Sequence, residues 1–507
     1  MTNANLFDCL AASVVDPSKT AIETEAGERN SYGELIALSG RLANLLRARG
    51  IEPGDRVAVQ VDKSVQSLVL YLATVRAGGV YLPLNPAYTL NELEYFIGDA
   101  EPALIVCDPL KRTGIETMAA RIGARVDTVD ADGRGSLTID AAQHPPEFQP
   151  VERAPDDLAA ILYTSGTTGR SKGAMLTHAN LLSNALVLNE VWRFGPNDTL
   201  IHALPIYHTH GLFVASNVTL FSGAAMIFLR KFDAGEIIGL MRRASVLMGV
   251  PTYYVRLLQH PNLTSAATAE MRLFVSGSAP LLAETHREWQ AKTGHAILER
   301  YGMTETNMNT SNPYDGERVA GTVGLPLPGV SVRIADPESG GDLPTETIGM
   351  IEVKGPNVFK GYWRMPEKTA AEFRPDGFFI TGDLGKIDRS GYVHILGRGK
   401  DLIITGGFNV YPKEVEAEID ALPGVVESAV IGLPHTDFGE GVTAVVVRAI
   451  ATGLDEKAIL AALDGRLARF KQPKRVLFVE DLPRNAMGKL QKNVLRERYA
   501  ALYGAAK

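Results

Sequence analysis

Cysteine is nearly absent from this sequence. Its 507 residues include two cysteines, Cys9 and Cys107, which lie far apart and form no Cys-x-x-Cys pair. This scarcity excludes a disulfide framework and a cysteine-based metal site. It also suits a reducing compartment, so we expect a cytoplasmic protein.

An excess of positive charge and a long membrane-spanning run are also missing. The formal net charge is -7, which argues against general binding to nucleic acids or to anionic membranes. Residues 211–229 carry no charge but include Asn217 and Ser222, so we interpret them as a buried helix followed by a buried strand. Residues 6–15 are apolar but contain Asp8 and follow no basic residue, which does not fit a secretory signal.

The hydrophobic pattern predicts an α/β protein of more than one domain. A chain of 507 residues is too long for one ordinary core. Short apolar runs alternate with helical patterns, which indicates layers of largely parallel sheet. The expected strands are 56–61, 104–107, 158–163, 245–250 and 273–276, and helices are expected at 32–49 and 91–97.

The pattern changes in the last third of the chain. After about residue 322, glycine and proline separate shorter strands, which predicts a small β subdomain. After Arg398 a compact, mobile α+β domain is expected, with helices at 412–419, 456–468 and 490–500 and strands at 426–431, 442–447 and 475–479. We therefore divide the chain into a large N-terminal domain (1–397), a hinge (398–400) and a C-terminal domain (401–507).

A loop rich in small polar residues follows the expected strand 158–163. Its sequence is Thr164-Ser-Gly-Thr-Thr-Gly-Arg-Ser-Lys172, which offers backbone N–H groups, hydroxyls and a lysine to phosphate oxygens. It is not a Walker A loop, because Ser171 replaces the second glycine and Gly173 follows the lysine. The alternative is a flexible surface loop, but a glycine- and hydroxyl-rich segment directly after an apolar strand favours phosphate binding.

This loop and five later motifs resemble the superfamily of acyl- and aryl-CoA synthetases, luciferases and adenylation domains. Any single motif can occur by chance, but the ordered set spans nearly the whole chain. The motifs are Tyr163-Thr-Ser-Gly-Thr-Thr-Gly-Arg-Ser-Lys-Gly173, Tyr301-Gly-Met-Thr-Glu305, Thr381-Gly-Asp383, Gly397-Arg-Gly-Lys-Asp401, Gly406-Gly-Phe-Asn-Val-Tyr-Pro412 and Pro483-Arg-Asn-Ala-Met-Gly-Lys489.

The resemblance implies that ATP first converts a carboxylic acid to an acyl-adenylate. Lys489 would be the adenylation lysine, and Glu305, with Thr164 as a second contact, would bind Mg²⁺. Cations and donors are needed because the phosphorus transition state carries spread negative charge. The nucleotide-binding residues implied are Thr164, Ser165, Gly166, Thr167, Thr168, Gly169, Lys172, Glu299, Tyr301, Gly302, Met303, Thr304, Asp383 and Arg398.

Each of these residues also has a simpler interpretation. Lys489 taken alone would be a solvated surface lysine, and Glu305 a carboxylate at a helix N-terminus. Asp383 would be a turn residue and Arg398 part of an interdomain ion pair.

The resemblance further implies that CoA accepts the acyl group after the C-terminal domain rotates about Lys400. Gly406, Gly407 and Phe408 would then border the pantetheine tunnel. Arg469 and Lys471 belong to a basic cluster suited to the CoA phosphates, although a solvated charged face is an equal alternative for each of them.

Two arginines suggest the identity of the acid. Arg256, Ser278 and Arg300 match the carboxylate-binding positions of the malonyl-CoA synthetase branch, and guanidinium groups bind a carboxylate through paired hydrogen bonds. The alternatives are a structural ion pair of Arg300 with Glu299 or another acid, and a solvent-facing Arg256. The resemblance thus implies malonate, ATP and CoA as substrates, with Mg²⁺.

Three further positions shape the expected pocket. His208 would lie near the reacting carboxylate as a catalytic residue, with a packed core histidine as the alternative. Thr209 and Met308 would limit the size of an α-substituent and so separate malonate from methylmalonate. Lys489 is expected on an exposed turn, open to a lysine acetyltransferase and a deacetylase.

Three other functions are considered. The enzyme could be a CoA ligase for methylmalonate or another small acid, or a stand-alone adenylation enzyme that loads a carrier protein. A nucleotide sensor without activity is disfavoured, because Lys489, Glu305 and Asp383 are all present.

Overall fold

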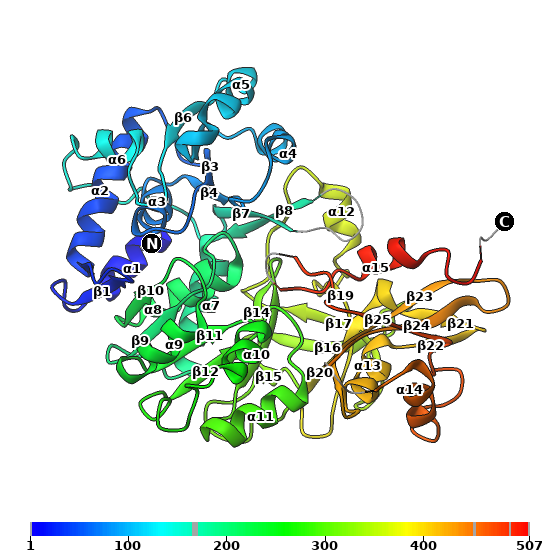
Figure 1. Ribbon diagram of the computed structural model, residues 1–507. Coiled ribbons are helices and arrows are strands. Elements are labelled where there is room, and N and C mark those ends of the chain that lie inside the picture. The colour runs from blue at the N-terminus through cyan, green and yellow to red at the C-terminus, as the bar shows by residue number, and fades with distance from the viewer. Residues whose placement is uncertain (1–2, 165–170, 450–452, 486–487, 505–507) are drawn as a thin grey trace.

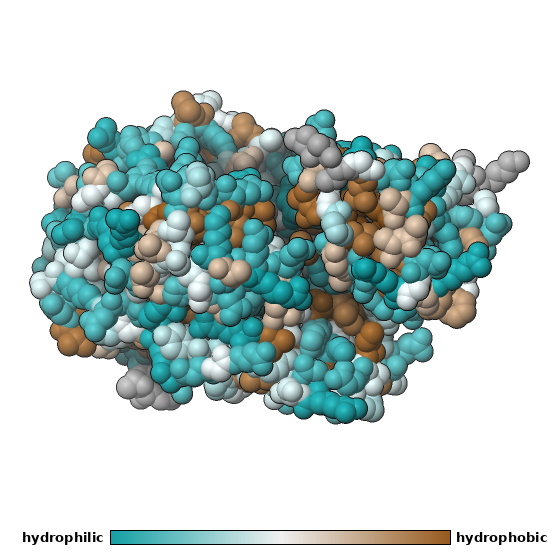
Figure 2. Space-filling model, turned by 60° about the horizontal axis from the view of Figure 1, so that its bottom comes forward, coloured by the Kyte–Doolittle hydropathy of each residue, from teal (hydrophilic) through white to brown (hydrophobic). Residues whose placement is uncertain are grey.

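The computed structural model describes residues 3–164, 171–449, 453–485 and 488–504. Two large sheets with their helices form the blue-to-green part of the molecule (Figure 1), and the C-terminal domain lies beside them in orange and red. Hydrophilic residues cover most of the face in Figure 2, with smaller hydrophobic groups between them. The expected α/β architecture with a smaller α+β C-terminal domain is confirmed.

The first large sheet has the strand order β18-β8-β7-β4-β3-β5-β6 within the described residues. Its strands from β7 to β6 run parallel, and β8 and β18 run antiparallel at one edge. The strands are β3 (Arg56–Gln60), β4 (Val80–Pro83), β5 (Leu104–Cys107), β6 (Arg125–Thr128), β7 (Leu158–Thr164), β8 (Lys172–Thr177) and β18 (Gly361–Tyr362).

The second large sheet has the order β15-β14-β13-β12-β11-β9-β10-β1-β2 in the same part of the chain. Neighbours from β1 to β13 are parallel, so their carboxyl ends share one edge, where ligands of α/β proteins bind. The strands are β1 (Thr20–Thr24), β2 (Arg29–Ser31), β9 (Thr199–His202), β10 (Ala225–Phe228), β11 (Val246–Gly249), β12 (Leu273–Ser276), β13 (Leu298–Met303), β14 (Asn307–Ser311) and β15 (Leu325–Pro326).

Helices connect and cover these strands, and several begin at a hydroxyl residue. Ser31, Ser64, Thr89 and Thr177 each close a capping box, which satisfies backbone N–H groups that a helix start leaves free. The helices are α1 (Leu6–Ser13), α2 (Tyr32–Ala48), α3 (Val65–Arg76), α4 (Leu90–Ala100), α5 (Arg112–Ile122), α6 (Ser136–Ala141), α7 (His178–Val191), α8 (Asn217–Phe221), α9 (Ala234–Leu240), α10 (Pro251–Gln259), α11 (Ala283–Thr293) and α12 (Pro366–Ala371).

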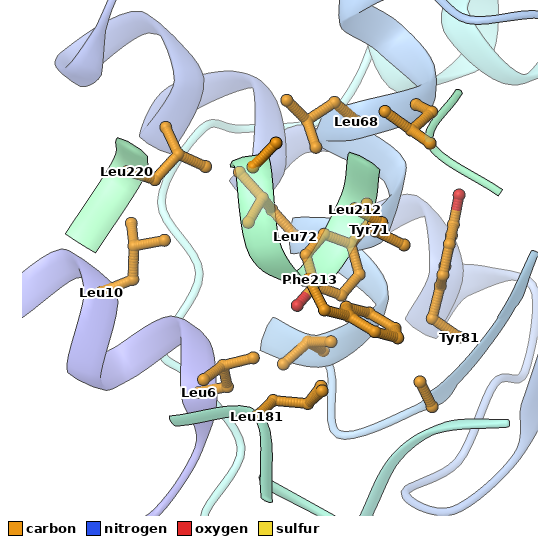
Figure 3. Packing of buried hydrophobic residues seen from close by; sticks show 14 of the residues in the cluster. Leu6, Leu10, Leu68, Tyr71, Leu72, Tyr81, Leu181, Leu212, Phe213 and Leu220 are labelled. Atoms are coloured by element: carbon orange, nitrogen blue, oxygen red, sulfur yellow. The ribbon is translucent and has the colours of Figure 1, made fainter. Parts of the chain in front are cut away.

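The main hydrophobic core joins the two large sheets through helices that lie between them. Figure 3 shows Leu6 of α1, Tyr71 of α3 and Leu181 of α7 converging on Phe213. The Tyr71 and Phe213 rings lie 5.8 Å apart between centroids. Strand residues such as Val59 of β3 and Met248 of β11 belong to the same cluster, so one core fixes the two sheets relative to each other.

The uncharged run at 211–229 is buried, as expected, but its helix is irregular. A π-helix (His210–Ser216) precedes α8, and β10 follows. Every residue from 210 to 221 is buried. No helix in the described part of the chain is both long and apolar enough to cross a bilayer.

The C-terminal third contains two smaller units. An antiparallel sheet is formed by β16 (Ser331–Ala335), β17 (Gly349–Lys354), β19 (Phe379–Ile387) and β20 (Val393–Arg398). A short 3₁₀ helix (Gly399–Asp401) leads from it to a separate sheet. That last unit comprises β21 (Ile403–Thr405), β22 (Phe408–Val410), β23 (Val425–His435), β24 (Gly439–Arg448), β25 (Arg475–Val479), α13 (Pro412–Asp420), α14 (Glu456–Leu463) and α15 (Lys492–Tyr499).

The helix expected at 456–468 ends five residues early in the structure. The prediction of a helix over 456–468 is wrong at its end, because α14 stops at Leu463. Asp464 has an extended ψ of 131°, and Gly465 follows with φ +77°. A backbone in these regions cannot continue an α-helix.

Candidate active site

Arg300 is a buried arginine with free hydrogen-bonding groups. It lies on β13 and is 3% exposed. Its Nε and Nη2 have no hydrogen-bond partner among the described residues, and burial lowers its pKa to about 9. Burying an unpaired charge costs several kcal/mol, so these groups are expected to face an anionic ligand.

The alternative of an ion pair between Arg300 and Glu299 is not found. The two residues are neighbours on β13, so their side chains point to opposite faces of the strand. Burial raises the pKa of Glu299 to about 8, and the positive charge of Lys413 opposes this rise. Arg300 is therefore available to a ligand.

The charge of Arg300 acts on His208 and His210, and its guanidinium lies against Gly277, the residue before Ser278. Ser278 follows β12 with a φ of +74°, and its Oγ lies 3.2 Å from His210 Nδ1. The His210 backbone N–H donates to His208 Nδ1 at 3.3 Å. Burial lowers the pKa of His208 to about 4, with Arg300 and Lys489 adding to the effect, so its imidazole is neutral at pH 7.

Lys489 reaches this group from the C-terminal domain. Its own backbone N–H donates to Asn485 Oδ1 at 3.0 Å. A Cβ on Gly488 would lie 3.1 Å from Thr252 Oγ1 at the start of α10, so the turn rests against the N-terminal domain. The expectation of an exposed turn is wrong, because this contact leaves Lys489 only partly accessible.

The charges around Lys489 are those of the expected nucleotide site. Burial and then Arg398 lower the pKa of Lys489, whereas Asp383 and Glu305 oppose this shift. Asp383 Oδ1 pairs with Arg398 Nε at 2.8 Å, and Tyr301 Oη donates to Asp383 Oδ2 at 2.5 Å. The ion pair of Arg398 thus joins two paired strands of one sheet, β19 and β20, and does not involve residues 401–507.

The phosphate-loop lysine meets Glu305 through a tyrosine. Lys172 Nζ lies 3.2 Å from Glu372 Oε1 and 4.1 Å from the centroid of the Tyr362 ring. Tyr362 Oη lies 3.0 Å from Glu305 Oε1 and 2.6 Å from Glu372 Oε2. Thr164 ends β7 close by in the sequence, whereas Ser165, Gly166, Thr167, Thr168 and Gly169 lie outside the described residues.

Glu305 fits the expected magnesium ligand. It is 6% exposed, and burial raises its pKa, so a cation at this carboxylate would offset the cost of burying its charge. Carboxylate oxygens are the ligands that Mg²⁺ prefers, usually together with phosphate and water oxygens. When bound there, the ion would neutralise phosphate charge.

The remaining residues of the Tyr301 motif lie at the end of β13 and in the turn that leads to β14. A Cβ on Gly302 would lie 1.7 Å from the Asn307 carbonyl oxygen, so only glycine allows this close approach. Met303 and Thr304 are half-buried at the turn. Thr209 and Met308 are both 2% exposed, and Thr209 Oγ1 has no hydrogen-bond partner among the described residues.

Arg256 is not part of the buried group. It lies on the exposed side of α10, with its guanidinium 6.0 Å from the centroid of the Phe232 ring. It follows Thr252 by one helical turn, so it shares the helix face that meets Gly488. Arg256 thus faces solvent in this structure, as its alternative interpretation expected. A contact between Arg256 and a substrate carboxylate stays a prediction.

The residues expected to bind CoA are on the surface of the C-terminal domain. Gly406 and Gly407 have φ values of +57° and +80°. Phe408 is 55% exposed and stacks on Phe470 at 4.7 Å between centroids. Lys471 pairs with Glu414 at 2.5 Å and Arg469 is exposed, as is Lys400 in the 3₁₀ helix.

Four site neighbours escaped the sequence analysis. They are Gly277, His210, Tyr362 and Glu372. His210 lies two residues after His208, which was a usable signal, but the other three meet the site only through contacts between segments that are distant in the sequence. β18, which carries Tyr362, pairs with β8, which carries Lys172.

Comparison with known proteins agrees with this geometry. Residues 11–363 match the family described as AMP-binding enzyme, and residues 414–489 match its C-terminal domain. The chain belongs to the AMP-binding enzyme family. It is 35% identical to a malonate–CoA ligase of Arabidopsis thaliana, with 93% of this chain and 85% of that protein covered. It is 37% identical to a feruloyl-CoA synthase of an Amycolatopsis species, with 96% and 97% covered.

A solved relative also matches the arrangement of the domains. The ATP-bound structure of MatB from Rhodopseudomonas palustris is 71% identical, with a TM-score of 0.98 over 99% of this chain and all of that one. The apo structure of MatB has the same identity and coverage but a TM-score of 0.88. Because the sequence identity is the same in both comparisons, the difference in TM-score reflects conformation. The backbone of the present structure is therefore more similar to ATP-bound MatB than to apo MatB.

Proposed function

We propose that this protein is an AMP-forming malonate–CoA ligase. It converts malonate, ATP and CoA to malonyl-CoA, AMP and diphosphate through malonyl-AMP. The observation that carries the proposal is the buried Arg300. Its Nε and Nη2 have no hydrogen-bond partner among the described residues, its charge acts on His208, and its guanidinium lies against Gly277, the residue before Ser278. A monocarboxylic acid would leave this cation unpaired, whereas the second carboxylate of malonate neutralises it.

In the first step, one carboxylate oxygen of malonate attacks the α-phosphorus of ATP, and diphosphate leaves. Lys489 approaches from the C-terminal domain, close to Arg398, Asp383 and Glu305, where it can stabilise charge on the α-phosphate. Lys172 neutralises phosphate charge after exchanging Glu372 for the nucleotide. Asp383 binds the ribose hydroxyls, and Arg398 holds that carboxylate in place.

In the second step, the CoA sulfur attacks the acyl carbon, AMP leaves, and the thiol proton passes to solvent. Gly406, Gly407 and Phe408 lie on the surface in the present arrangement, so they reach the acyl group only after the C-terminal domain rotates. We place the hinge at 398–400, between the N-terminal domain (1–397) and the C-terminal domain (401–507). The 3₁₀ helix at Gly399–Asp401 joins their sheets.

A panel of acids tests the substrate assignment. ATP–diphosphate exchange is measured with malonate, methylmalonate, sulfoacetate, acetate, coumarate and octanoate. Malonate is expected to give the highest kcat/KM, and diacids are expected to exceed monoacids as a class. Faster exchange with coumarate or octanoate would contradict the assignment and leave the adenylation chemistry intact.

The acceptor and the cellular context need separate tests. AMP release with malonate and free CoA supports CoA as acceptor, whereas release that requires an added carrier protein would favour the loading enzyme. We also propose that the protein is cytoplasmic and that a lysine acetyltransferase and a deacetylase act on Lys489. Because Lys489 is partly covered, we expect the acetyltransferase to act when the C-terminal domain has moved.

A further inference from the structure

Lys63 is a buried lysine whose hydrogen bonds, among the described residues, go to none of the expected site residues. It lies between β3 and α3 and is 8% exposed. Its Nζ lies 2.9 Å from His202 Nδ1, 2.7 Å from the His202 carbonyl oxygen and 2.9 Å from the Leu204 carbonyl oxygen. These three acceptors match the three N–H groups of an ammonium.

His202 extends this contact to the other end of a loop. Because Lys63 donates to Nδ1, Nε2 carries the ring hydrogen and donates to the Gly211 carbonyl oxygen at 2.9 Å. Ser216 Oγ donates to the same carbonyl oxygen at 2.9 Å. Lys63 and His202 thus hold residues 202 and 204 at one end and residue 211 at the other.

The loop between these anchors borders a cavity and leads into the expected acid site. Ala203, Pro205, Ile206 and Tyr207 line a cavity of about 270 Å³, together with Lys63. His208 and His210, which follow directly, lie beside Arg300 and Ser278. A shift of the loop would therefore move two groups of the acid site at once.

We propose that Lys63 is a positioning residue for acid activation, acting through His202 on the loop that carries His208 and His210. This inference rests on the proposed function for the identity of the acid. Burying a lysine that pairs with no carboxylate among the described residues is costly, and a methionine of similar length would fill the space without that cost. The three hydrogen bonds of Lys63, two to His202 and one to Leu204, hold the start of the loop instead. A misplacement of about 1 Å can cost a factor of about 10² in rate.

The test compares Lys63→Met with Lys63→Arg and with Lys292→Met. Lys292 also donates to a backbone carbonyl, that of Leu258 at 2.6 Å, but does not touch the loop. In malonate-dependent exchange, we expect Lys63→Met to lower kcat/KM for malonate about tenfold or more, while KM for ATP changes less than twofold. Lys63→Arg should recover part of the loss, and Lys292→Met should show none.

A double mutant separates positioning from general stability. If Lys63 acts through His202, adding His202→Phe to Lys63→Met should cost no more than the larger single change. If Lys63→Met does not fold, His202→Asn should show the same selective loss. Three outcomes would overturn the proposal. They are additive losses of kcat/KM in the double mutant, equal changes in the kinetic constants for ATP and for malonate, and a lowered Tm with unchanged kinetics. If the wild type adenylates another acid, the proposed substrate fails and the same comparison is made with that acid.

Discussion

The guanidinium of Arg300 lies directly against the backbone of Gly277. A Cβ at residue 277 would be 2.4 Å from Arg300 Nη1 and 2.5 Å from Cζ. Real Cβ atoms do not approach so closely, so a side chain here and the observed position of Arg300 exclude each other. The missing side chain at Gly277 therefore allows the Arg300 guanidinium to occupy its observed position.

Gly277→Ala should damage malonate use without touching a ligand. Overpacking a filled site typically costs about 1–3 kcal/mol, and here the displaced group is the one that faces the acid. We expect kcat/KM for malonate to fall on the order of 10- to 100-fold, with a smaller change in KM for ATP. Gly98→Ala on α4 is the control, because a Cβ there meets no atom within 4 Å. Equal kinetics for both variants would show that Arg300 does not bind the acid from its present position.

Replacing Arg300 should weaken malonate binding more than replacing Arg256. Arg300→Lys keeps a charge but loses the planar pair of donors, so we expect KM for malonate to rise at least tenfold and Mg-ATP binding to persist. Arg256→Ala should have a smaller effect that weakens further at high salt, because an exposed charge is screened. Exchange assays at low and high ionic strength measure both effects. A larger loss from Arg256→Ala would reverse this assignment.

Local patterns predicted the strands and helices well, because hydrophobic period and capping act over a few residues. β5 (Leu104–Cys107), β12 (Leu273–Ser276) and β25 (Arg475–Val479) have the expected bounds. The predicted helices were wrong at Gly465, where a single φ angle ends the helix, and at residues 210–216, where the helix is of the π type.

The site was predictable in chemistry but not in contacts. The motifs identified Lys489, Asp383 and Arg300, yet no local signal places Gly277 against a guanidinium or Tyr362 between Glu305 and Glu372. Such contacts depend on pairing between distant strands. The exposure of Arg256 and the partial burial of Lys489 likewise depend on how a helix and a domain are oriented, which the sequence does not state.

Loss of charge on Lys489 should separate the two half-reactions. Lys489→Gln, or acetylation of Lys489, removes the cation beside Asp383 and Glu305, so we expect malonyl-AMP formation to fall more than 100-fold. Thioester formation from supplied malonyl-AMP should stay within a few-fold of the wild type, because the residues that we expect to bind CoA lie elsewhere. Lys457→Gln, at an exposed position on α14, is the control. Equal loss of both half-reactions would contradict a role confined to adenylation.

His178 should make the N-terminal domain sensitive to acid. Its side chain is fully buried, and Nδ1 accepts a hydrogen bond from the Leu6 backbone N–H at 3.0 Å. Burial, with Arg153, lowers its pKa from 6.5 to about 4. The unfolded chain therefore binds the proton more readily, so stability is complete above about pH 6.5 and falls as the pH drops toward 4.

The expected loss from this one group is about 2 kcal/mol between pH 7 and pH 5, since one pKa unit corresponds to about 1.4 kcal/mol. Urea unfolding of the wild type and of His178→Gln at both pH values measures it. Glutamine can still accept the hydrogen bond from Leu6 but does not titrate, so its free energy of unfolding should fall by about 2 kcal/mol less over the same interval. Burial also lowers the pKa of His208, but His208 is present in both proteins. Its contribution to the pH dependence therefore cancels when the two free energies of unfolding are subtracted. Parallel pH profiles for the two proteins would show that His178 is not the acid-sensitive group.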